Sequence, residues 1–355
     1  MQQFMIKKNE AGQRLDKFLH KYLKEASGSF LYKMLRKKNI TLNDKKAEGK
    51  EKLEEGDCIR FYFSEETFLK FRGEGKESSG EKSDISRAEP SREYQKAFHT
   101  LNGIEIIEEN QDIILLNKPA GVLSQKAQAG DLSLNEWLIG YLLERKEITI
   151  KQLETFKPSV CNRLDRNTSG LVVCGKSLPG SQKMSQLLRE RSVHKYYRTF
   201  VKGDLTRTAH VKGYLCKDGV RNKVLFKLSL SPADRGFEQV ETRYTPLARY
   251  DGRMTYLEVE LITGKPHQIR AHLAHLGHPI LGDSKYGDGS FNHSFRPLKL
   301  QWQLLHAYRL EMPRLEADFE ELSGKIYVAP EPGIFEELKE YAIKEWGEIR
   351  GRKGK

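Results

Sequence analysis

Residues 161–177 read CNRLDRNTSGLVVCGKS, and in this stretch a polar segment runs directly into an apolar one. The apolar residues 171–174 form a short run of the kind that is typical of a buried strand. The polar residues before it are therefore expected in an ordered loop beside a sheet, where catalytic side chains commonly lie. In an extended loop Arg163 and Asp165 point to the same side, because side chains alternate with a period of two. A structural ion pair would give the same pattern, so this stretch alone leaves both interpretations open.

Strand and helix patterns follow one another along residues 99–330. Strand patterns cover residues 113–116, 171–174 and 255–262, and the last of these alternates Leu257, Val259 and Leu261 with Tyr256, Glu258 and Glu260. Helix patterns cover residues 134–144, 184–189 and 268–276. This mixture predicts an α+β fold for residues 99–330, with a mixed but mainly antiparallel sheet.

The composition favours a polyanionic partner. The 355 residues carry 61 Lys and Arg against 49 Asp and Glu, a formal net charge of +12, which makes nucleic acid the first candidate. No apolar run approaches the roughly 20 residues that span a bilayer, and no secretion-type leader is recognisable, so we expect a cytoplasmic protein that does not bind membranes. The four cysteines are widely spaced and read as reduced thiols.

Residues 1–63 hold half of the excess charge, with 15 Lys and Arg and 9 Asp and Glu. The positions of Leu15, Phe18, Leu19 and Tyr22 predict one amphipathic helix. A second helix should bury Leu31 and Leu35, expose its lysines and arginine, and end at Asn39 in a left-handed conformation.

This segment resembles an S4 domain, a small RNA-binding module. The resemblance rests on RLDKFL (14–19), LRKKNITLNDKK (35–46) and LEEGDCIRF (53–61), with Asn39 where the family usually has Gly. A basic helical hairpin that only improves solubility would carry similar charges. The resemblance implies that RNA contacts Lys33, Arg36, Lys37, Lys38, Lys45 and Lys46.

Two further segments complete the expected organisation. Residues 64–98 are rich in Ser, Gly, Glu and Lys, which predicts a flexible polar linker. Residues 331–355 are expected to form a C-terminal helix with an apolar stripe, followed by a basic tail.

The large domain resembles the RluA-type pseudouridine synthases, which isomerise uridine to pseudouridine in RNA. RLD (163–165) followed by NTSG (167–170) matches the family signature. Four further blocks follow the family order: NKPAGVLSQ (117–125), HKYYRTFVKG (194–203), LITGKPHQIRAHLAHLGHPILGDSKYG (261–287) and LLHAYRL (304–310). Asn162 stands where the family commonly has His, a departure that bears on the subgroup rather than on the chemistry.

The resemblance implies an isomerase that needs no cofactor, with Asp165 as its nucleophile. A carboxylate suits the breaking of a glycosidic bond if it stays ionised, and for that it needs a nearby cation. By the family's pattern Arg270 is that cation, and Tyr197 is the aromatic residue that stacks on the flipped uracil and takes part in proton transfer. Asp165 could attack the ribose C1′, attack the uracil ring or promote a glycal route, and the sequence leaves the three open.

Four more residues are candidates for contacts with the substrate. Arg163 is suited to hold a phosphate or to fill the place of the flipped nucleotide. Lys118 and Lys265 are expected to approach phosphates, and Thr168 belongs to the signature itself. His267, His272, His275 and His278 invite a metal site, but their spacing lacks the H-E-x-x-H pattern, and we expect no metal.

The expected substrate is large-subunit (23S) rRNA, bound by a monomer, because S4-bearing members of the family usually act there. A tRNA substrate is the alternative within the same family. Two other classes stay open: an RNA-binding chaperone without catalysis, and a glycoside hydrolase. The hydrolase needs a second acidic partner, and no comparably placed Asp or Glu stands out.

Overall fold

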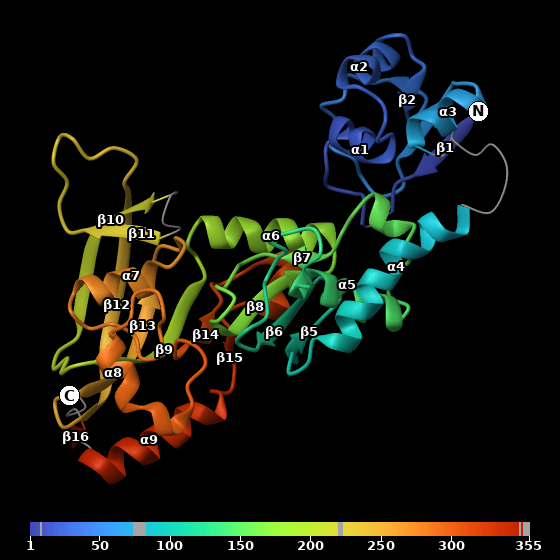
Figure 1. The fold of residues 1–355 in the computed structure, drawn as a ribbon. Helices are drawn as coiled ribbons and strands as arrows, with labels where there is room; N and C mark the ends of the chain where they lie inside the picture. Colours follow the sequence, from blue (N-terminus) through green and yellow to red (C-terminus); the bar gives the residue numbers. More distant parts are fainter. Residues whose placement is uncertain (8, 74–82, 219–222, 348, 351–355) are drawn as a thin grey trace.

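The computed structural model describes residues 1–7, 9–73, 83–218, 223–347 and 349–350. It contains a small N-terminal sheet and a large sheet that runs through the rest of the chain (Figure 1). Helices pack against both sheets. The mixed α and β content with mostly antiparallel strand pairing confirms the predicted α+β class. Among the described residues, no helix is long and apolar enough to cross a membrane.

The N-terminal sheet is antiparallel, with the order β1-β4-β2-β3. Its elements are β1 (Gln2–Met5), α1 (Leu15–Tyr22), α2 (Gly28–Arg36), β2 (Ile40–Leu42), β3 (Lys45–Lys46) and β4 (Cys58–Phe61). The predicted apolar stripe of α1 is buried, as are Leu31 and Leu35 of α2. These side chains form one core with Ile59 and Phe61 of β4, so both helices pack on one face of the sheet.

The six predicted RNA-contacting residues are all exposed: two lie in α2, two directly follow it, and the other two form β3. The helix ends one residue earlier than expected: Lys38, and not Asn39, has the left-handed backbone (φ 58°). The carbonyl of Asn39 already accepts a hydrogen bond from the backbone N–H of Tyr62 (2.9 Å), just beyond β4, so the turn has to be complete before residue 39.

The expected flexible linker over residues 64–98 is wrong where the structure describes it. Helix α3 (Glu65–Arg72) begins at a Ser64 cap and buries Phe68 in the N-terminal core. Helix α4 (Ser83–Thr100) buries Tyr94 and Ala97 beside α5 (Leu134–Glu144), and residues 74–82 lie outside the described part. The apolar residues are few but evenly placed, and an average composition hides that spacing.

The N-terminal region also contacts the large domain directly. Thr155 Oγ1 donates to Glu10 Oε1 (2.7 Å), and Arg72 pairs with Glu154 (2.7 Å). Both partners in the large domain lie at the short 3-10 helix η1 (Gln152–Glu154), so α3 and its preceding domain are tied to one edge of the large domain.

The large sheet has twelve strands with the central order β11-β10-β12-β13-β9-β14-β8-β6-β5. The pair β14–β8 is parallel and the other pairs are antiparallel. Its strands are β5 (Glu105–Glu109), β6 (Ile113–Lys118), β7 (Ser159–Val160), β8 (Ser169–Gly175), β9 (His194–Lys202), β10 (Ala209–Asp218), β11 (Lys223–Lys227), β12 (Glu238–Tyr250), β13 (Met254–Leu261), β14 (Leu305–Glu311), β15 (Ile326–Val328) and β16 (Ile349–Arg350). The remaining helices are α6 (Leu178–Arg189), α7 (Gln268–His275), α8 (Gly289–Ser294), η2 (Arg296–Leu298), η3 (Ala317–Leu322) and α9 (Gly333–Trp346).

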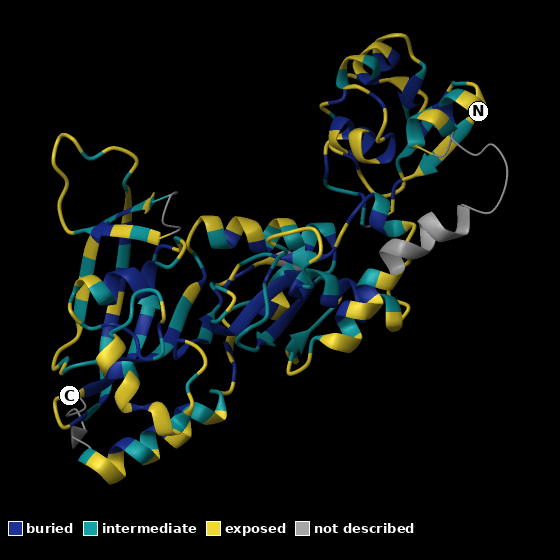
Figure 2. Ribbon diagram, viewed as in Figure 1, coloured by how far each residue is buried: buried dark blue, intermediate teal, exposed yellow. Residues whose placement is uncertain are grey.

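The central strands that surround the site are mostly buried (Figure 2). Every residue of β8 is buried, which explains its unbroken apolar run. In β13 the predicted inner residues Leu257, Val259 and Leu261 are buried. Tyr256 on the other face is buried too, because α9 covers it there together with Phe200.

Gly170 allows β8 and β14 to approach each other closely. Its φ is +112°, and a Cβ at this position would lie 2.3 Å from the carbonyl oxygen of Ala307 in β14. No side chain fits there, so the glycine that ends the NTSG part of the signature is required for packing beside the loop that carries Asp165.

We expect Gly170→Ala to lower the free energy of unfolding by roughly 3 kcal/mol, because it adds a steric clash to the backbone strain. Gly56→Ala is the matched control, since Gly56 also has a positive φ (+91°) but no atom within 4 Å of the new Cβ. The control should cost only about 1 kcal/mol. Urea unfolding of both variants measures the difference, and equal losses would contradict the close-approach argument.

Candidate active site

Asp165 lies in the loop of residues 161–168 that leads into β8. The side chain of Asn162 fastens this loop to the strand, because its Oδ1 accepts from the backbone N–H of Val173 (2.7 Å). Leu164 is buried, and its backbone N–H and carbonyl both bond to Ser124 Oγ (3.0 Å each). Asp165 therefore turns outward, with 25% of its side chain exposed. Asn162, the departure from the family pattern, thus fixes the loop.

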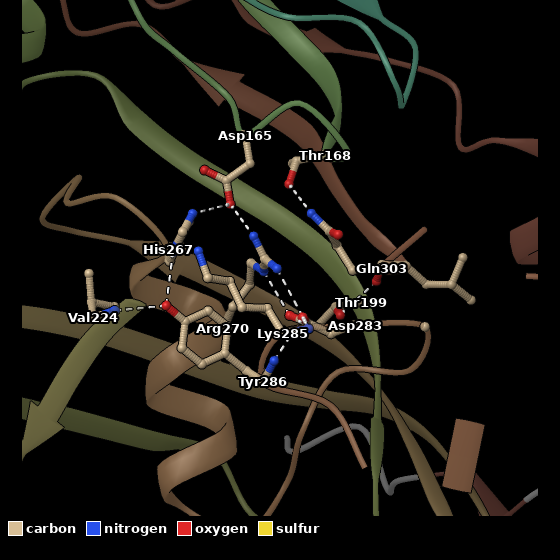
Figure 3. A network of polar contacts seen from close by, with 12 residues as sticks. Asp165, Thr168, Thr199, Val224, His267, Arg270, Asp283, Lys285, Tyr286 and Gln303 are labelled. Atoms are coloured by element: carbon tan, nitrogen blue, oxygen red, sulfur yellow. Dashed lines mark hydrogen bonds and ion pairs between the residues drawn. The ribbon is translucent and has the colours of Figure 1, made fainter. Parts of the chain in front are cut away.

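Arg270 of α7 joins Asp165 to a second carboxylate. Its NH1 donates to Asp165 Oδ2 (2.8 Å), while Nε and NH2 donate to the two oxygens of Asp283 (2.7 and 2.9 Å; Figure 3). Burial acts to lower the pKa of Arg270, but the hydrogen bonds and charges of Asp283 and Asp165 raise it well above its ordinary value. Burial acts to raise the pKa of Asp283, but the hydrogen bonds and charge of Arg270, together with the backbone N–H groups of Tyr286 and Lys285, lower it below its ordinary value. The guanidinium is thus charged and held in one orientation.

Three residues beside this pair were missed as site residues by sequence reasoning. Asp283 is fully buried, and the backbone N–H groups of Lys285 and Tyr286 also donate to it (2.8 and 3.0 Å). Lys285 itself lies in the same group of side chains in Figure 3. All three belong to the GDSKYG part of the 261–287 block, so the motif held the signal although no chemistry had been assigned to these positions.

His267 faces Asp165 from the start of α7. Its Nε2 lies 3.9 Å from Asp165 Oδ2, and its Nδ1 lies 2.9 Å from Tyr286 Oη, which in turn accepts from the backbone N–H of Val224 (2.8 Å). Burial lowers the pKa of His267, although the charge of Asp165 acts in the opposite direction. In the sequence His267 stood out only as one of four clustered histidines without a metal, and its place beside Asp165 was not predicted.

Tyr197 lies in the middle of β9 and is buried. Burial raises its pKa well above the ordinary value, and the charge of Asp165 adds to this effect, so the phenol is neutral. Its neighbour Tyr196 points to the opposite face, where the Arg309 guanidinium lies 4.0 Å from the ring centre. The strand register therefore turns Tyr197, and not Tyr196, toward the side of the sheet that carries Asp165, as the motif register predicted.

The expectation that Lys118 approaches phosphate is wrong. The side chain is fully buried, and Nζ donates to the carbonyl oxygens of Pro119 (2.9 Å), Val122 (2.8 Å) and Arg166 (3.1 Å). Burial lowers the pKa of Lys118 to about 7, and the charge of Asp165 opposes that shift. Lys118 thus holds two loops together beneath Asp165 and is not accessible to RNA.

The other three candidate substrate contacts differ in their burial. Thr168 is buried, and its hydroxyl accepts from Gln303 Nε2 (3.2 Å); its contact with substrate stays a prediction. Lys265 forms an ion pair with Glu238 of β12, and its approach to phosphate stays a prediction. Arg163 is exposed on the Asp165 loop, and its contact with substrate stays a prediction.

The four clustered histidines do not come together as one metal-binding group. His272 is buried against the Phe226 ring (centroids 4.4 Å apart), and His278 Nδ1 lies 2.9 Å from the carbonyl oxygen of Lys202. Within the described ranges, no group of three or more His, Cys, Asp or Glu side chains could hold a metal ion.

Comparison with known proteins agrees with this geometry. Residues 112–275 match the RNA pseudouridylate synthase family. The chain is 30% identical over 318 residues to ribosomal large subunit pseudouridine synthase C of Haemophilus influenzae, and the match covers 87% of each chain. This chain belongs to the RNA pseudouridine synthase family. It is accordingly an isomerase that acts on RNA.

Other pseudouridine synthases show the same likeness. The chain is 28% identical to ribosomal large subunit pseudouridine synthase D of Neisseria meningitidis, over 86% of this chain and 74% of that one. The solved structure of human RNA pseudouridylate synthase domain containing 4 aligns with a TM-score of 0.54 at 20% identity, over 75% of this chain and 99% of that chain. The latter likeness shows a shared fold.

The pKa of Lys118 gives a prediction for stability. From about pH 7 to pH 10 the folded protein binds fewer protons than the unfolded chain, in which Lys118 keeps its ordinary pKa. Wild type should therefore gain stability over Lys118→Met as the pH rises through this window, by up to about 1.4 kcal/mol per pH unit. Urea unfolding across the window measures the gap, and parallel curves would show that Lys118 stays charged in the folded protein.

Proposed function

We propose that this pseudouridine synthase acts on large-subunit rRNA, with Asp165 as its nucleophile and without a cofactor. The observation that carries the assignment of Asp165 is its ion pair with Arg270, which places a fixed positive charge 2.8 Å from a partly exposed carboxylate oxygen. Two relatives are named ribosomal large subunit pseudouridine synthases, and these names support the proposed rRNA substrate.

The reaction moves the ribose C1′ from N1 to C5 of the same uracil, so the atoms and electrons balance within the substrate. When Asp165 attacks C1′, a carboxylate O–C1′ bond forms as the C1′–N1 bond breaks. After the uracil turns, C5 displaces the carboxylate, C5 loses its proton and N1 gains one. Attack on the uracil ring also uses Asp165 as a nucleophile, whereas in a glycal route Asp165 takes the proton from the ribose C2′. All three routes need an ionised Asp165 held by Arg270.

Tyr197 and the buried strands complete the proposed site. The neutral phenol beside Asp165 suits a ring that packs on the flipped uracil and donates a proton. Because RNA enzymes of this kind must take the base out of its stack, the site needs a rigid apolar wall, and β9 supplies it at Tyr197.

The N-terminal domain is the proposed module for RNA capture. Its six exposed basic side chains stand on one helix end and the adjacent hairpin, as the S4 resemblance implies. Such a surface recognises phosphates and shape rather than sequence. We further propose that the protein works as a cytoplasmic monomer.

Asp165→Asn should abolish pseudouridine formation, by at least about a thousandfold, because the amide keeps the shape but removes the nucleophile. The purified protein is incubated with 23S rRNA transcribed without modifications, and pseudouridine is mapped chemically. The thermal unfolding midpoint and RNA binding of the variant control for its folding. Equal signals from wild type and variant would refute the role of Asp165. If pseudouridine formed only in tRNA, the proposed rRNA substrate would be wrong. Release of free uracil would indicate a hydrolase.

Arg270→Lys should lower kcat by about a hundredfold with little change in KM, because an ammonium cannot bridge two carboxylates in the fixed geometry of the guanidinium. Arg249→Lys is the matched control, since Arg249 makes a similar two-pronged pair with Asp204 at the surface. Single-turnover kinetics on the same rRNA measures both. An unchanged kcat for Arg270→Lys would mean that the positive charge alone suffices.

A further inference from the structure

Trp302 carries an exposed indole ring in the catalytic domain. It is 39% exposed, and the other Phe, Tyr and Trp side chains described within residues 99–330 are all buried or half-buried. In the same described part, neither an aromatic ring nor a cation stacks on it. Single exposed apolar residues are common, so exposure alone carries no functional meaning.

The position of Trp302 is what distinguishes it. Its ring lies over Gly121, where a Cβ would be 3.7 Å from Cζ2. Gly121 is joined by two hydrogen bonds to Arg166, the residue that follows Asp165: Gly121 N–H donates to the Arg166 carbonyl (2.9 Å), and Arg166 Nε donates to the Gly121 carbonyl (3.0 Å). The indole therefore sits against the Gly121 loop, which is hydrogen-bonded to the loop that presents Asp165.

The backbone around Trp302 contacts the other half of the catalytic pair. Gly282 packs on the Trp302 carbonyl so closely that a Cβ would lie 2.3 Å from its oxygen, and the next residue is Asp283, the buried partner of Arg270. The following residue, Gln303, donates to Thr168 on the Asp165 loop (Figure 3). The chain at residues 302–303 is thus held between the two segments that carry the site, and this fixes the base of the Trp302 side chain.

The charges beside the ring fit a nucleic acid. Arg163 and Arg166 are both exposed on the loop next to Gly121, in a chain with a net charge of +12. An exposed aromatic face flanked by arginines is the arrangement with which proteins bind unpaired nucleotides, the ring by stacking on a base and the cations by contact with phosphates.

We infer that Trp302 is a stacking platform for the base of a nucleotide next to the target uridine. The inference rests on the proposed function, in which the uridine itself enters the site at Asp165 and Tyr197. When that uridine leaves its stack, the neighbouring base loses a stacking partner, and the indole replaces it. The platform thus offsets part of the cost of flipping and selects RNA that is already unpaired at this position.

Trp302 fluorescence tests the contact directly. In the Asp165→Asn background, which prevents turnover, the probe is a seven-nucleotide RNA with one central uridine. Binding should quench the indole emission, and Asp165→Asn/Trp302→Phe should lack that quenching, because Trp137 is buried and Trp346 lies on α9. RNAs with an abasic ribose on one side of the uridine or the other should separate the two flanks, with quenching lost for one of them. Quenching that survives in the Trp302→Phe variant would overturn the inference.

Kinetics on rRNA gives the second readout. Trp302→Leu should raise KM by about 5- to 150-fold at nearly unchanged kcat, since it removes the stacking of one base, while Trp302→Phe should have a smaller effect. Ile326→Ala, at an exposed apolar position of β15, is the control and should leave KM unchanged. If Trp302→Leu is active, keeps its unfolding midpoint and has the KM of wild type, the stacking platform is refuted while the proposed function stands. A wild-type protein that makes no pseudouridine refutes the proposed function, and the fluorescence arm still decides the stacking.

Discussion

The guanidinium of Arg270 is the group on which the site depends, because it satisfies two carboxylates from different loops at once. Asp283 is fully buried and needs a cation, and Asp165 needs a fixed partner if its exposed oxygen is to face the substrate. Removing one member of such a buried set leaves a charge without compensation, which costs about 3–5 kcal/mol. The same contact therefore stabilises the fold and orients the reactive group.

Much of the fold and the central residues followed from periodicity and motif order. The helix expected at residues 134–144 is α5 with the same bounds, and the inner residues of β13 are buried as their spacing requires. Asp165 and Arg270 are 105 positions apart, yet their motifs indicated that they meet, as the 2.8 Å contact shows. These features depend on local pattern or on short motifs, which a single sequence records.

Other roles depend on contacts that only the folded chain reveals. Lys118 was predicted to contact phosphate, but one of its three acceptors is the carbonyl of Arg166, 48 residues away. Every residue has a backbone carbonyl, so the sequence does not indicate which of them a lysine will contact. Thr168 is likewise occupied by Gln303 from a distant segment. The predicted linker failed for a different reason, since a few well-spaced apolar residues such as Phe68 order a helix whose average composition is polar.

The parallel pair β8–β14 has a consequence for the timing of assembly during translation. Ser169 hydroxyl and His306 Nδ1, 2.8 Å apart, are separated by 137 residues, and Gly170 meets Ala307 at the same point. The loop before β8 gains these supports only after residue 307 has been synthesised, long after Asp165 itself has been added to the chain. A nascent polypeptide that ends earlier lacks these supports of the carboxylate loop, so premature termination should release an inert protein rather than an enzyme of reduced selectivity.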